Sequence, residues 1–233
     1  MIYFILLKIL IFYRKYVNIN TQGGALMDLY KYPRTYHFPF SEGATSDDKI
    51  LKDTTIFDGK QIVITEKMDG ENTTIYNGYF HARSLDSKHQ VYHSWLAQFV
   101  SSMSYNIPDG YRICGEYLYA KHSIGYDNLK SYFYGFSVWE ENKCLSWDET
   151  MEWFEMLDIV PVPVLYEGIF NEDVVKKIAK ETVARGGEGI VVRLADSFNY
   201  EDFSSSVAKF VRKNHVQTDK HWSTSEIKKN NLE

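Results

Sequence analysis

The chain has 233 residues and a formal net charge of −5, from 26 lysines and arginines against 31 aspartates and glutamates. This length is ample for a buried core in one large domain or two small ones. The acidic balance excludes a global basic field for nucleic acid, so any nucleic-acid binding must come from a local positive patch.

The two cysteines, Cys114 and Cys144, lie within apolar or aromatic runs that are typical of strands. Two such residues make neither a disulfide framework nor a set of metal ligands. A reducing intracellular compartment, and with it a cytoplasmic location, is the default expectation.

The N-terminal residues 1–13 form an apolar run that Lys8 interrupts. A membrane-spanning helix needs about 20 residues, so this run is too short to cross a bilayer and we expect no stable membrane association. Positive charges follow the run instead of preceding it, which disfavours a signal peptide. We interpret residues 1–26 as a dispensable or disordered leader, with a weak membrane-surface anchor as the alternative.

The next informative stretch surrounds Lys67. A β-branched strand over residues 62–65 leads through Lys67 to the dipeptide Asp69-Gly70, and a second β-branched run begins at Thr73. Glycine accepts a positive φ angle without steric cost, and Asp-Gly therefore suits a tight turn. We predict a hairpin that holds Lys67 near its bend. A short strand over residues 79–84 follows.

Three helices and five further strands are expected in the rest of the chain. Apolar residues at every fourth position predict a helix over residues 90–103. A capping box at Ser146 begins a helix that reaches about Leu157, and Asn171 caps another that reaches about Val183. The strand-like runs are residues 111–119, 131–139, 160–165, 188–193 and 207–212.

The order of these elements shows no regular alternation of strand and helix, which indicates an α+β fold with largely antiparallel sheets. Two prolines make residues 160–165 an expected edge strand. No linker or repeat divides the chain, so we expect one domain over residues 27–222. The polar segment 223–233 is expected to fray.

Polar side chains interrupt the apolar strand runs at Lys67, Asn72, Arg83, Glu116, Glu188, Arg193, Lys209 and Arg212. A charge in such a run is costly to bury unless it is paired or liganded. Cations and carboxylates that converge on one cleft would suit a polyphosphate with its metal ion, and aromatic strand residues would offer a stacking surface for a base. No P-loop or Rossmann glycine pattern is present in the sequence.

Six segments, in this order, resemble the motifs of the covalent nucleotidyltransferases, which comprise polynucleotide ligases and RNA capping enzymes. They are Glu66–Asn72, which resembles the nucleotide-attachment site, His81–Ser84, Cys114–Ile124, Tyr134–Trp139, Glu188–Arg193 and Ala208–Lys213. The set is most similar to that of the ATP-dependent RNA ligases. The resemblance covers nearly all of residues 27–222 and implies a domain of largely antiparallel sheets, flanked by helices, around an ATP cleft.

The resemblance also implies roles for single residues. An ATP-dependent RNA ligase would join RNA 5′-phosphate and 3′-hydroxyl ends through a lysyl-AMP intermediate on Lys67. Glu116 would bind the ribose, Glu188 would hold Mg²⁺, and Phe136 would stack on the adenine. Further contacts with ATP are implied for Glu66, largely through its backbone, and for Asn72, Arg83, Arg193, Lys209 and Arg212. Because a lysine amine is mostly protonated at neutral pH, Arg193, Lys209 and the metal would have to activate it.

Two departures from the family pattern and several alternatives remain open. Val211 stands where a second lysine of the last motif is common, so Arg212 or Lys213 would supply that charge. Arg193 stands where many relatives have lysine. The chain after this motif is too short for the extra domain of DNA ligases and capping enzymes, which leaves room for a separate C-terminal module or a partner protein.

The alternative functions are a DNA ligase, a GTP-using nucleotidyltransferase of the capping type, and a non-catalytic nucleic-acid-binding relative. The histidines His81, His122 and His215 have no zinc spacing and are interpreted as structural residues or as residues at the substrate edge.

Overall fold

The computed structural model describes residues 29–76, 78–213 and 227–233, and residues Lys31–Glu233 make one compact unit. The expected leader over residues 1–26 lies outside the described residues, as does His215. Within the described ranges, no helix combines the length and the apolar character that a bilayer span requires.

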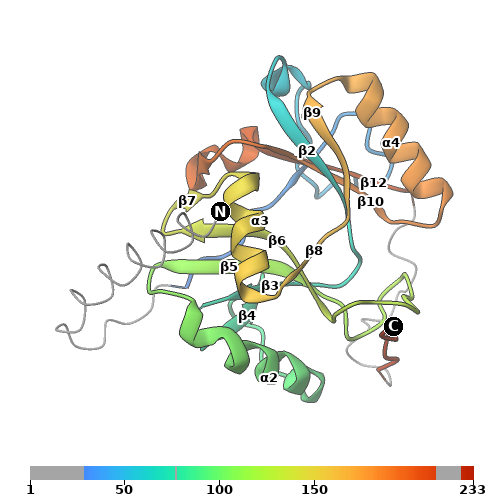
Figure 1. Ribbon diagram of the computed structural model, residues 1–233. Helices are drawn as coiled ribbons and strands as arrows, with labels where there is room; N and C mark the ends of the chain where they lie inside the picture. The colour runs from blue at the N-terminus through green and yellow to red at the C-terminus, as the bar shows by residue number, and fades with distance from the viewer. Residues whose placement is uncertain (1–28, 77, 214–226) are drawn as a thin grey trace. The chain divides into compact units, whose positions relative to one another are not determined.

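Strands of the compact unit form two β-sheets (Figure 1). The first contains, in spatial order, β1 (Tyr36–His37), β12 (Val207–Val211), β10 (Gly189–Leu194), β2 (Gln61–Glu66) and β9 (Val164–Ile169). The second contains β11 (Phe198–Asn199), β7 (Lys143–Cys144), β6 (Phe133–Glu140), β5 (Tyr111–Tyr117), β3 (Glu71–Ile75) and β4 (Phe80–Ala82), with β8 (Val160–Pro161) beside β6. Most neighbouring strands are antiparallel, and the predicted α+β fold is confirmed.

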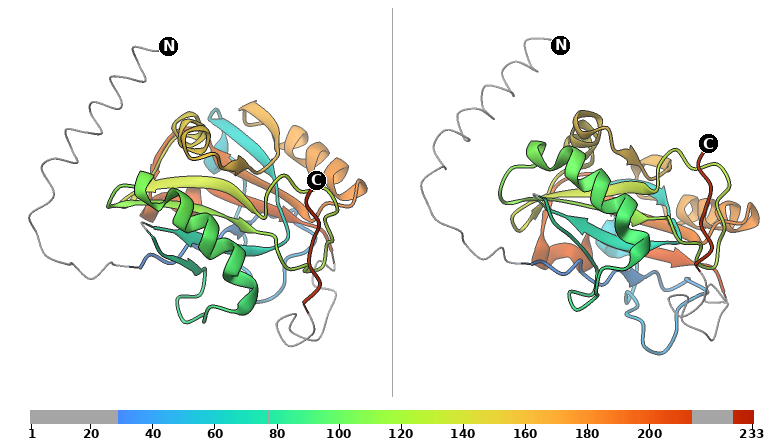
Figure 2. Two further views of the ribbon diagram at one scale, coloured as in Figure 1. Left: turned by 60° about the horizontal axis from the view of Figure 1, so that its bottom comes forward. Right: turned by 90° about the horizontal axis from the view of Figure 1, so that it is seen from below.

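In the described part of the chain, three α-helices pack on these sheets: α2 (Ser94–Met103), α3 (Trp147–Leu157) and α4 (Glu172–Ala184). Helices α2 and α3 share an apolar core with the second sheet, and α4 shares another with the first (Figures 1 and 2). Short 3₁₀ helices lie at Thr55–Phe57, Val91–His93, Ser104–Asn106 and Tyr200–Ser205.

The alternation of side chains along β2 explains how the two sheets are joined. Ile62 and Ile64 point into the core under α4, whereas Val63 belongs to the core of the second sheet. Successive side chains of a strand point to opposite faces, so one face of the first sheet meets α4 and the other meets the second sheet. A third apolar cluster between the sheets includes Cys114 and Cys144, both free thiols.

The structure confirms both predicted helix N-caps, at Ser146 and Asn171. The hydroxyl of Ser146 accepts a hydrogen bond from the Glu149 N–H, and the Glu149 carboxylate returns to the Ser146 N–H, which completes the capping box of α3. The Asn171 side chain accepts from the first N–H groups of α4. The strand over 160–165 is split into β8 and β9, and β9 lies at the edge of its sheet.

The predicted hairpin around Lys67 is wrong. β2 and β3 belong to different sheets, since β2 pairs with β9 and β10 while β3 pairs with β4 and β5. Gly70 also has no positive φ angle; a Cβ atom there would lie only 2.5 Å from the Tyr117 carbonyl oxygen. Glycine is needed because two backbones approach closely, and Lys67 lies where the chain crosses between the sheets.

The prediction that residues 223–233 fray is wrong for the described part of that segment. Residues 227–233 bond to the loop after β5, and Asn230 is only 2% exposed. The polar composition suggested a solvated end, but these polar groups satisfy backbone groups of that loop.

Candidate active site

Lys67 and Glu188 form an ion pair where two neighbouring strands of the first sheet come together. The Lys67 N–H donates to the Gly189 carbonyl, and the Lys67 Nζ donates to Glu188 Oε2 at 2.7 Å. The Glu188 side chain is 5% exposed, while that of Lys67 is 24% exposed. A buried carboxylate of this kind needs a partner, and the lysine that reaches solvent supplies it.

The second sheet contributes Glu116 to the same place. This residue lies on β5, and its Oε1 accepts a hydrogen bond from the Gly70 N–H at 3.1 Å. Burial raises the pKa of Glu116 to about 8; Lys67 opposes that rise and Glu188 adds to it. Burial lowers the pKa of Lys67, but the charges of Glu188 and Glu116 outweigh burial and leave this pKa raised. Lys67 is therefore a charged ammonium in this state of the protein.

The shifted pKa of Glu116 predicts how a neutral replacement changes stability with pH. Between its ordinary value of 4.5 and about 8, the folded state binds one more proton at Glu116 than the unfolded chain, so stability falls as pH rises through this window. Glutamine cannot ionise. We therefore expect Glu116→Gln to raise the unfolding temperature relative to the unaltered protein more at about pH 8.5 than at about pH 5.5.

Thermal unfolding at both pH values measures this difference. Glu155→Gln, which replaces an exposed carboxylate on α3, is the control and should behave alike at the two pH values. An equal effect of Glu116→Gln at both pH values would contradict the raised pKa.

Further cations and polar groups from both sheets surround this pair. Lys209 lies on β12 opposite Val191, and its pKa is lowered by burial and by the charges of Lys67 and Arg83. Arg83 follows β4, and Asn72 lies beside Glu116 on the neighbouring strand. Among the described residues, Arg83 Nε and Asn72 Oδ1 are buried without a hydrogen-bond partner. Unsatisfied groups of this kind are costly, and a ligand with phosphate or hydroxyl oxygens would satisfy them.

Asp69 is a site residue to which the sequence assigned no role of its own, beyond its place in the predicted turn and in the segment Glu66–Asn72. Its Oδ2 accepts hydrogen bonds from Ser123 Oγ at 2.6 Å and from the Ile124 N–H at 2.7 Å. Its own N–H donates to the hydroxyl of Tyr126 at 2.9 Å. The segment after Lys67 is thus bound to the loop after β5. The only signal in the sequence was the position of Asp69 two residues after the lysine.

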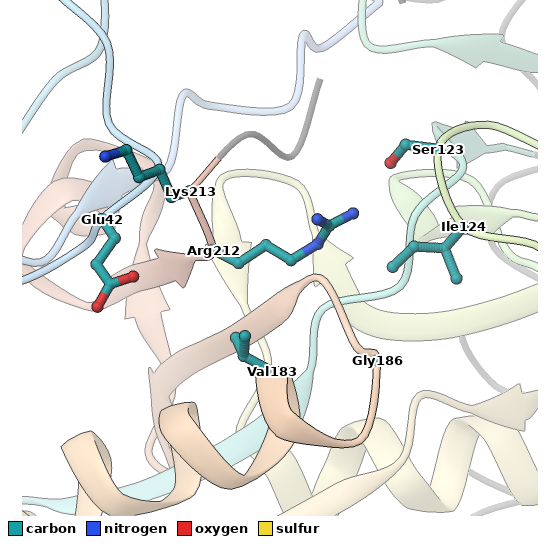
Figure 3. A pocket seen from close by; sticks show the side chains of 7 residues that line it. All are labelled: Glu42, Ser123, Ile124, Val183, Gly186, Arg212 and Lys213. Atoms are coloured by element: carbon teal, nitrogen blue, oxygen red, sulfur yellow. The ribbon is translucent and has the colours of Figure 1, made fainter. Parts of the chain in front are cut away.

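A pocket of about 520 Å³ adjoins this group (Figure 3). Its lining residues are Glu42, Ser123, Ile124, Val183, Gly186, Arg212 and Lys213. The Arg212 side chain extends towards Ser123 and Ile124, and its Nε is buried without a hydrogen-bond partner among the described residues. The backbone N–H of Arg212 donates to the Glu188 carbonyl. The pocket therefore offers an arginine beside the buried ion pair.

The sequence placed Arg193 among the phosphate-binding cations, and the structure does not bring it to this group. Its guanidinium donates to the carbonyls of Leu145, at 2.7 Å, and Leu194, and it lies over the rings of Trp147 and Phe198. Arg193 is 5% exposed. Being four residues after Gly189, it reaches the other end of β10, where it ties the strand to the start of α3.

Two other predicted contacts have a different setting from the one expected. The Glu66 N–H, one of the backbone groups expected to meet a base, already donates to the Pro163 carbonyl at 2.8 Å, and the Glu66 carboxylate lies 3.6 Å from Arg185. Phe136 is half-buried on β6, with its ring 5.2 Å from that of Tyr32 in an edge-to-face arrangement. Its stacking on adenine stays a prediction. His81 is buried and bonds the Ala82 carbonyl, as a structural residue would.

The donor set fits a magnesium ion. Mg²⁺ is usually held by one or two carboxylates, with water and substrate phosphates as its other ligands. The charge of Glu188 adds to the raised pKa of Glu116, so the two carboxylates lie close together, and a cation between them would relieve their repulsion. Within the described residues there is no group of three or more acidic, histidine or cysteine side chains that could hold a metal without such a substrate.

Fold and site together define a ligase-type nucleotidyltransferase domain, and comparison with solved structures agrees. An archaeal ATP-dependent RNA ligase aligns with a TM-score of 0.58 and 15% identity over 83% of this chain and 51% of that chain. An RNA ligase of Naegleria gruberi with pyrophosphate aligns with a TM-score of 0.51 and 17% identity over 84% of this chain and 60% of that one. At these identities the likeness establishes the fold alone.

A family model narrows the class. The model described as RNA ligase matches residues 60–211, which is more than half of the chain, and the protein belongs to the RNA ligase family. Comparison with curated proteins gave no match. The chain spans about half the length of the archaeal RNA ligase that it resembles.

Proposed function

We propose that the protein is an ATP-dependent RNA ligase that joins RNA 5′-phosphate and 3′-hydroxyl ends through a lysyl-AMP intermediate on Lys67. The observation that carries the proposal is the setting of Lys67, which pairs with the buried Glu188 at 2.7 Å and has Glu116 and Lys209 around it. Membership of the RNA ligase family supports it. So do the ligands of similar Naegleria gruberi RNA ligases, one solved with AMP and manganese and another with pyrophosphate.

In the first step, the Lys67 amine attacks the α-phosphorus of ATP. A bond forms between Nζ and phosphorus, the bond from phosphorus to the bridging oxygen of pyrophosphate breaks, and Nζ gives up its extra protons. The charged ammonium of Lys67 must first lose a proton, because only the neutral amine can attack. Glu188 is the nearest base to that proton, because it already accepts a hydrogen bond from Nζ.

Cationic side chains would stabilise the charge that develops on the phosphates. Lys209 lies near Lys67 and Arg83, and a positive neighbour favours the neutral form of the nucleophile. Arg212 would hold the outgoing pyrophosphate from the adjoining pocket. Asn72 Oδ1 would accept a hydrogen bond from a ribose hydroxyl, and Arg83 Nε would donate one to a phosphate oxygen. Glu116 would accept a hydrogen bond from a ribose hydroxyl.

Glu188, with Glu116 beside it, would hold Mg²⁺. The metal would supply charge neutralisation at the phosphate oxygens when bound. The residues of the chain would orient the nucleophile, exclude water and hold the adenine of ATP.

The later steps use the same group. An oxygen of the RNA 5′-phosphate attacks the phosphorus of the lysyl adenylate, the bond to Nζ breaks, and the lysine recovers its protons. The RNA 3′-hydroxyl then attacks the 5′-phosphorus, the phosphodiester forms, the hydroxyl proton is lost, and AMP leaves. The net acidic charge of the chain means that RNA affinity should be modest and salt-sensitive.

The experiment that tests this proposal is incubation of the protein with α-labelled ATP and magnesium, followed by denaturing electrophoresis. Label that stays on the protein is expected. Label from GTP but not from ATP would assign the protein to the capping type instead, and no label from either, on folded protein, would overturn the enzyme proposal in favour of a non-catalytic binder.

A second measurement separates RNA from DNA. We expect joined product from RNA with 5′-phosphate and 3′-hydroxyl ends, and little from matching DNA ends. A preference for DNA would contradict the substrate while leaving the lysyl-AMP step intact. We propose a separate C-terminal module or a partner protein as the source of further RNA contacts.

The remaining expectations join the proposal. We propose that residues 27–222 carry the adenylyltransferase domain and that the protein works in a reducing intracellular compartment. Burial raises the pKa values of the two free thiols, Cys114 and Cys144, which keeps them as unreactive thiols.

A further inference from the structure

Residues 227–233 lie along the loop that follows β5 and add a short extended segment to it. Main-chain hydrogen bonds join Lys121 to Lys228 at 2.7 Å, Asn230 to Tyr119 at 3.0 Å and Leu129 to Asn231 at 3.0 Å. The Lys229 ammonium lies over the rings of Tyr119 and Tyr132. Segment 227–233 is therefore bound along its length.

The side chain of Asn230 bridges two points of this loop, Leu118 and Tyr126. It is buried, its Nδ2 donates to the Leu118 carbonyl at 2.8 Å, and its Oδ1 accepts from the Tyr126 N–H at 2.9 Å. Leu118 begins the loop between β5 and β6, and Tyr126 lies eight residues further along it. A single amide thus joins the two ends of residues 118–126, and asparagine is suited to this because it offers both a donor and an acceptor.

The same loop holds the segment that carries Lys67. Ser123 and Ile124 donate to the Asp69 carboxylate, and the hydroxyl of Tyr126 accepts from the Asp69 N–H. Asp69 is two residues from Lys67, so three hydrogen bonds, two to the Asp69 carboxylate and one from its backbone N–H, connect the closed loop to the segment beside the lysine.

We propose that Asn230 is a positioning residue for Lys67: by closing residues 118–126 it keeps the loop against Asp69 and so holds the lysine in line with its target. The proposal rests on the proposed function, because the positioning concerns the attack of Lys67 on ATP. Asn230 bonds loop backbone and is not among the groups that would touch ATP. Misplacement of a reacting group by about 1 Å can cost about 100-fold in rate, so a remote change of this kind is measurable.

The test compares Asn230→Ala, Asn230→Asp and Asn231→Ala in the full chain. Asn230→Ala removes both loop bonds, Asn230→Asp keeps only the acceptor for the Tyr126 N–H, and Asn231→Ala removes one exposed bond to Asp127. We expect the maximal rate of labelling by α-labelled ATP to fall about tenfold in Asn230→Ala, with the half-saturating ATP concentration unchanged. Asn230→Asp should be intermediate, and Asn231→Ala should match the unaltered protein.

A substrate that bypasses Lys67 distinguishes positioning from general damage. RNA that already carries AMP on its 5′-phosphate needs no attack by the lysine, so Asn230→Ala should join it at nearly the unaltered rate. Equal losses in labelling and in this joining step would overturn the proposal. Labelling of Asn230→Ala at the unaltered rate would overturn it too while leaving the proposed function in place, whereas absence of label on the unaltered protein would overturn the proposed function itself.

Hydrogen exchange tests the structural half without any activity, and it serves if Asn230→Ala does not fold. Backbone amides of residues 118–126 should exchange faster in Asn230→Asp than in the unaltered protein, while those of α4 should not change. Unchanged exchange in residues 118–126 would overturn the role of Asn230 in closing the loop.

Discussion

In Lys67→Ala, the rate of covalent labelling by α-labelled ATP is expected to fall by about four orders of magnitude or more. No other group can replace a nucleophile that forms the covalent bond. The substitution also leaves the Glu188 carboxylate, only 5% exposed, without its cation, which should cost about 1–3 kcal/mol of stability. Labelling is therefore measured on protein that circular dichroism shows to be folded.

Lys67→Arg separates the chemistry from the fold. A guanidinium can keep an ion pair with Glu188, but it does not lose its proton in proteins and cannot act as the nucleophile. We expect Lys67→Arg to be about as stable as the unaltered protein but, like Lys67→Ala, to carry no label. RNA that is already adenylated should still be joined by Lys67→Ala, because that step breaks no bond to lysine.

Label on Lys67→Ala or Lys67→Arg at the unaltered rate would assign the nucleophile elsewhere. Peptide mapping of the labelled protein would then identify it, with Lys209 the first residue to examine because it lies close enough to Lys67 for the charge of Lys67 to lower its pKa.

Gly189→Ala is expected to have the largest effect on stability. A Cβ atom at this position would lie 2.0 Å from the Phe210 carbonyl oxygen and 3.0 Å from the Val211 Cα, and both obstacles are backbone atoms. The strands β10 and β12 would have to separate, at a cost of about 3 kcal/mol or more. Thermal and urea unfolding measure the loss, which should appear in expression as a smaller soluble fraction.

Gly59→Ala is the matched control for this prediction. Gly59 has a φ angle of 69° but nothing lies within 4 Å of its added Cβ, so only backbone strain of about 1–2 kcal/mol is expected. A Gly189→Ala protein as stable as Gly59→Ala would contradict the close approach of β10 and β12. That approach matters for the site because it brings Glu188, which immediately precedes β10, close to Lys209 on β12.

Several features of the fold were predictable because their causes are local. The caps at Ser146 and Asn171 involve a side chain and backbone groups two or three residues away, and any chain with these residues can form them. The edge position of β9 follows from the prolines beside it, which cannot donate to a neighbouring strand.

Three predictions failed where the deciding partner is distant in sequence. Asp69-Gly70 has the composition of a turn, but the strands on either side find better partners in β10 and β5, at least 38 residues away. Arg193 shares a strand with residues of the site yet lies at its far end, over Trp147. Asn230 sits in a polar stretch whose partners, Leu118 and Tyr126, are more than 100 residues earlier.

The sequence by itself therefore determined the α+β class, the positions of the helices and the family, because motif residues in a fixed order and short-range caps need no knowledge of the packing. Only the tertiary structure decided which of the charged residues meet. Glu116 and Lys209 lie on strands of different sheets, Lys67 follows the end of β2 and Glu188 precedes the start of β10, so the pairing of these strands decides which of the side chains meet. Their shifted pKa values, and the loop that Asn230 closes beside them, are properties of that pairing.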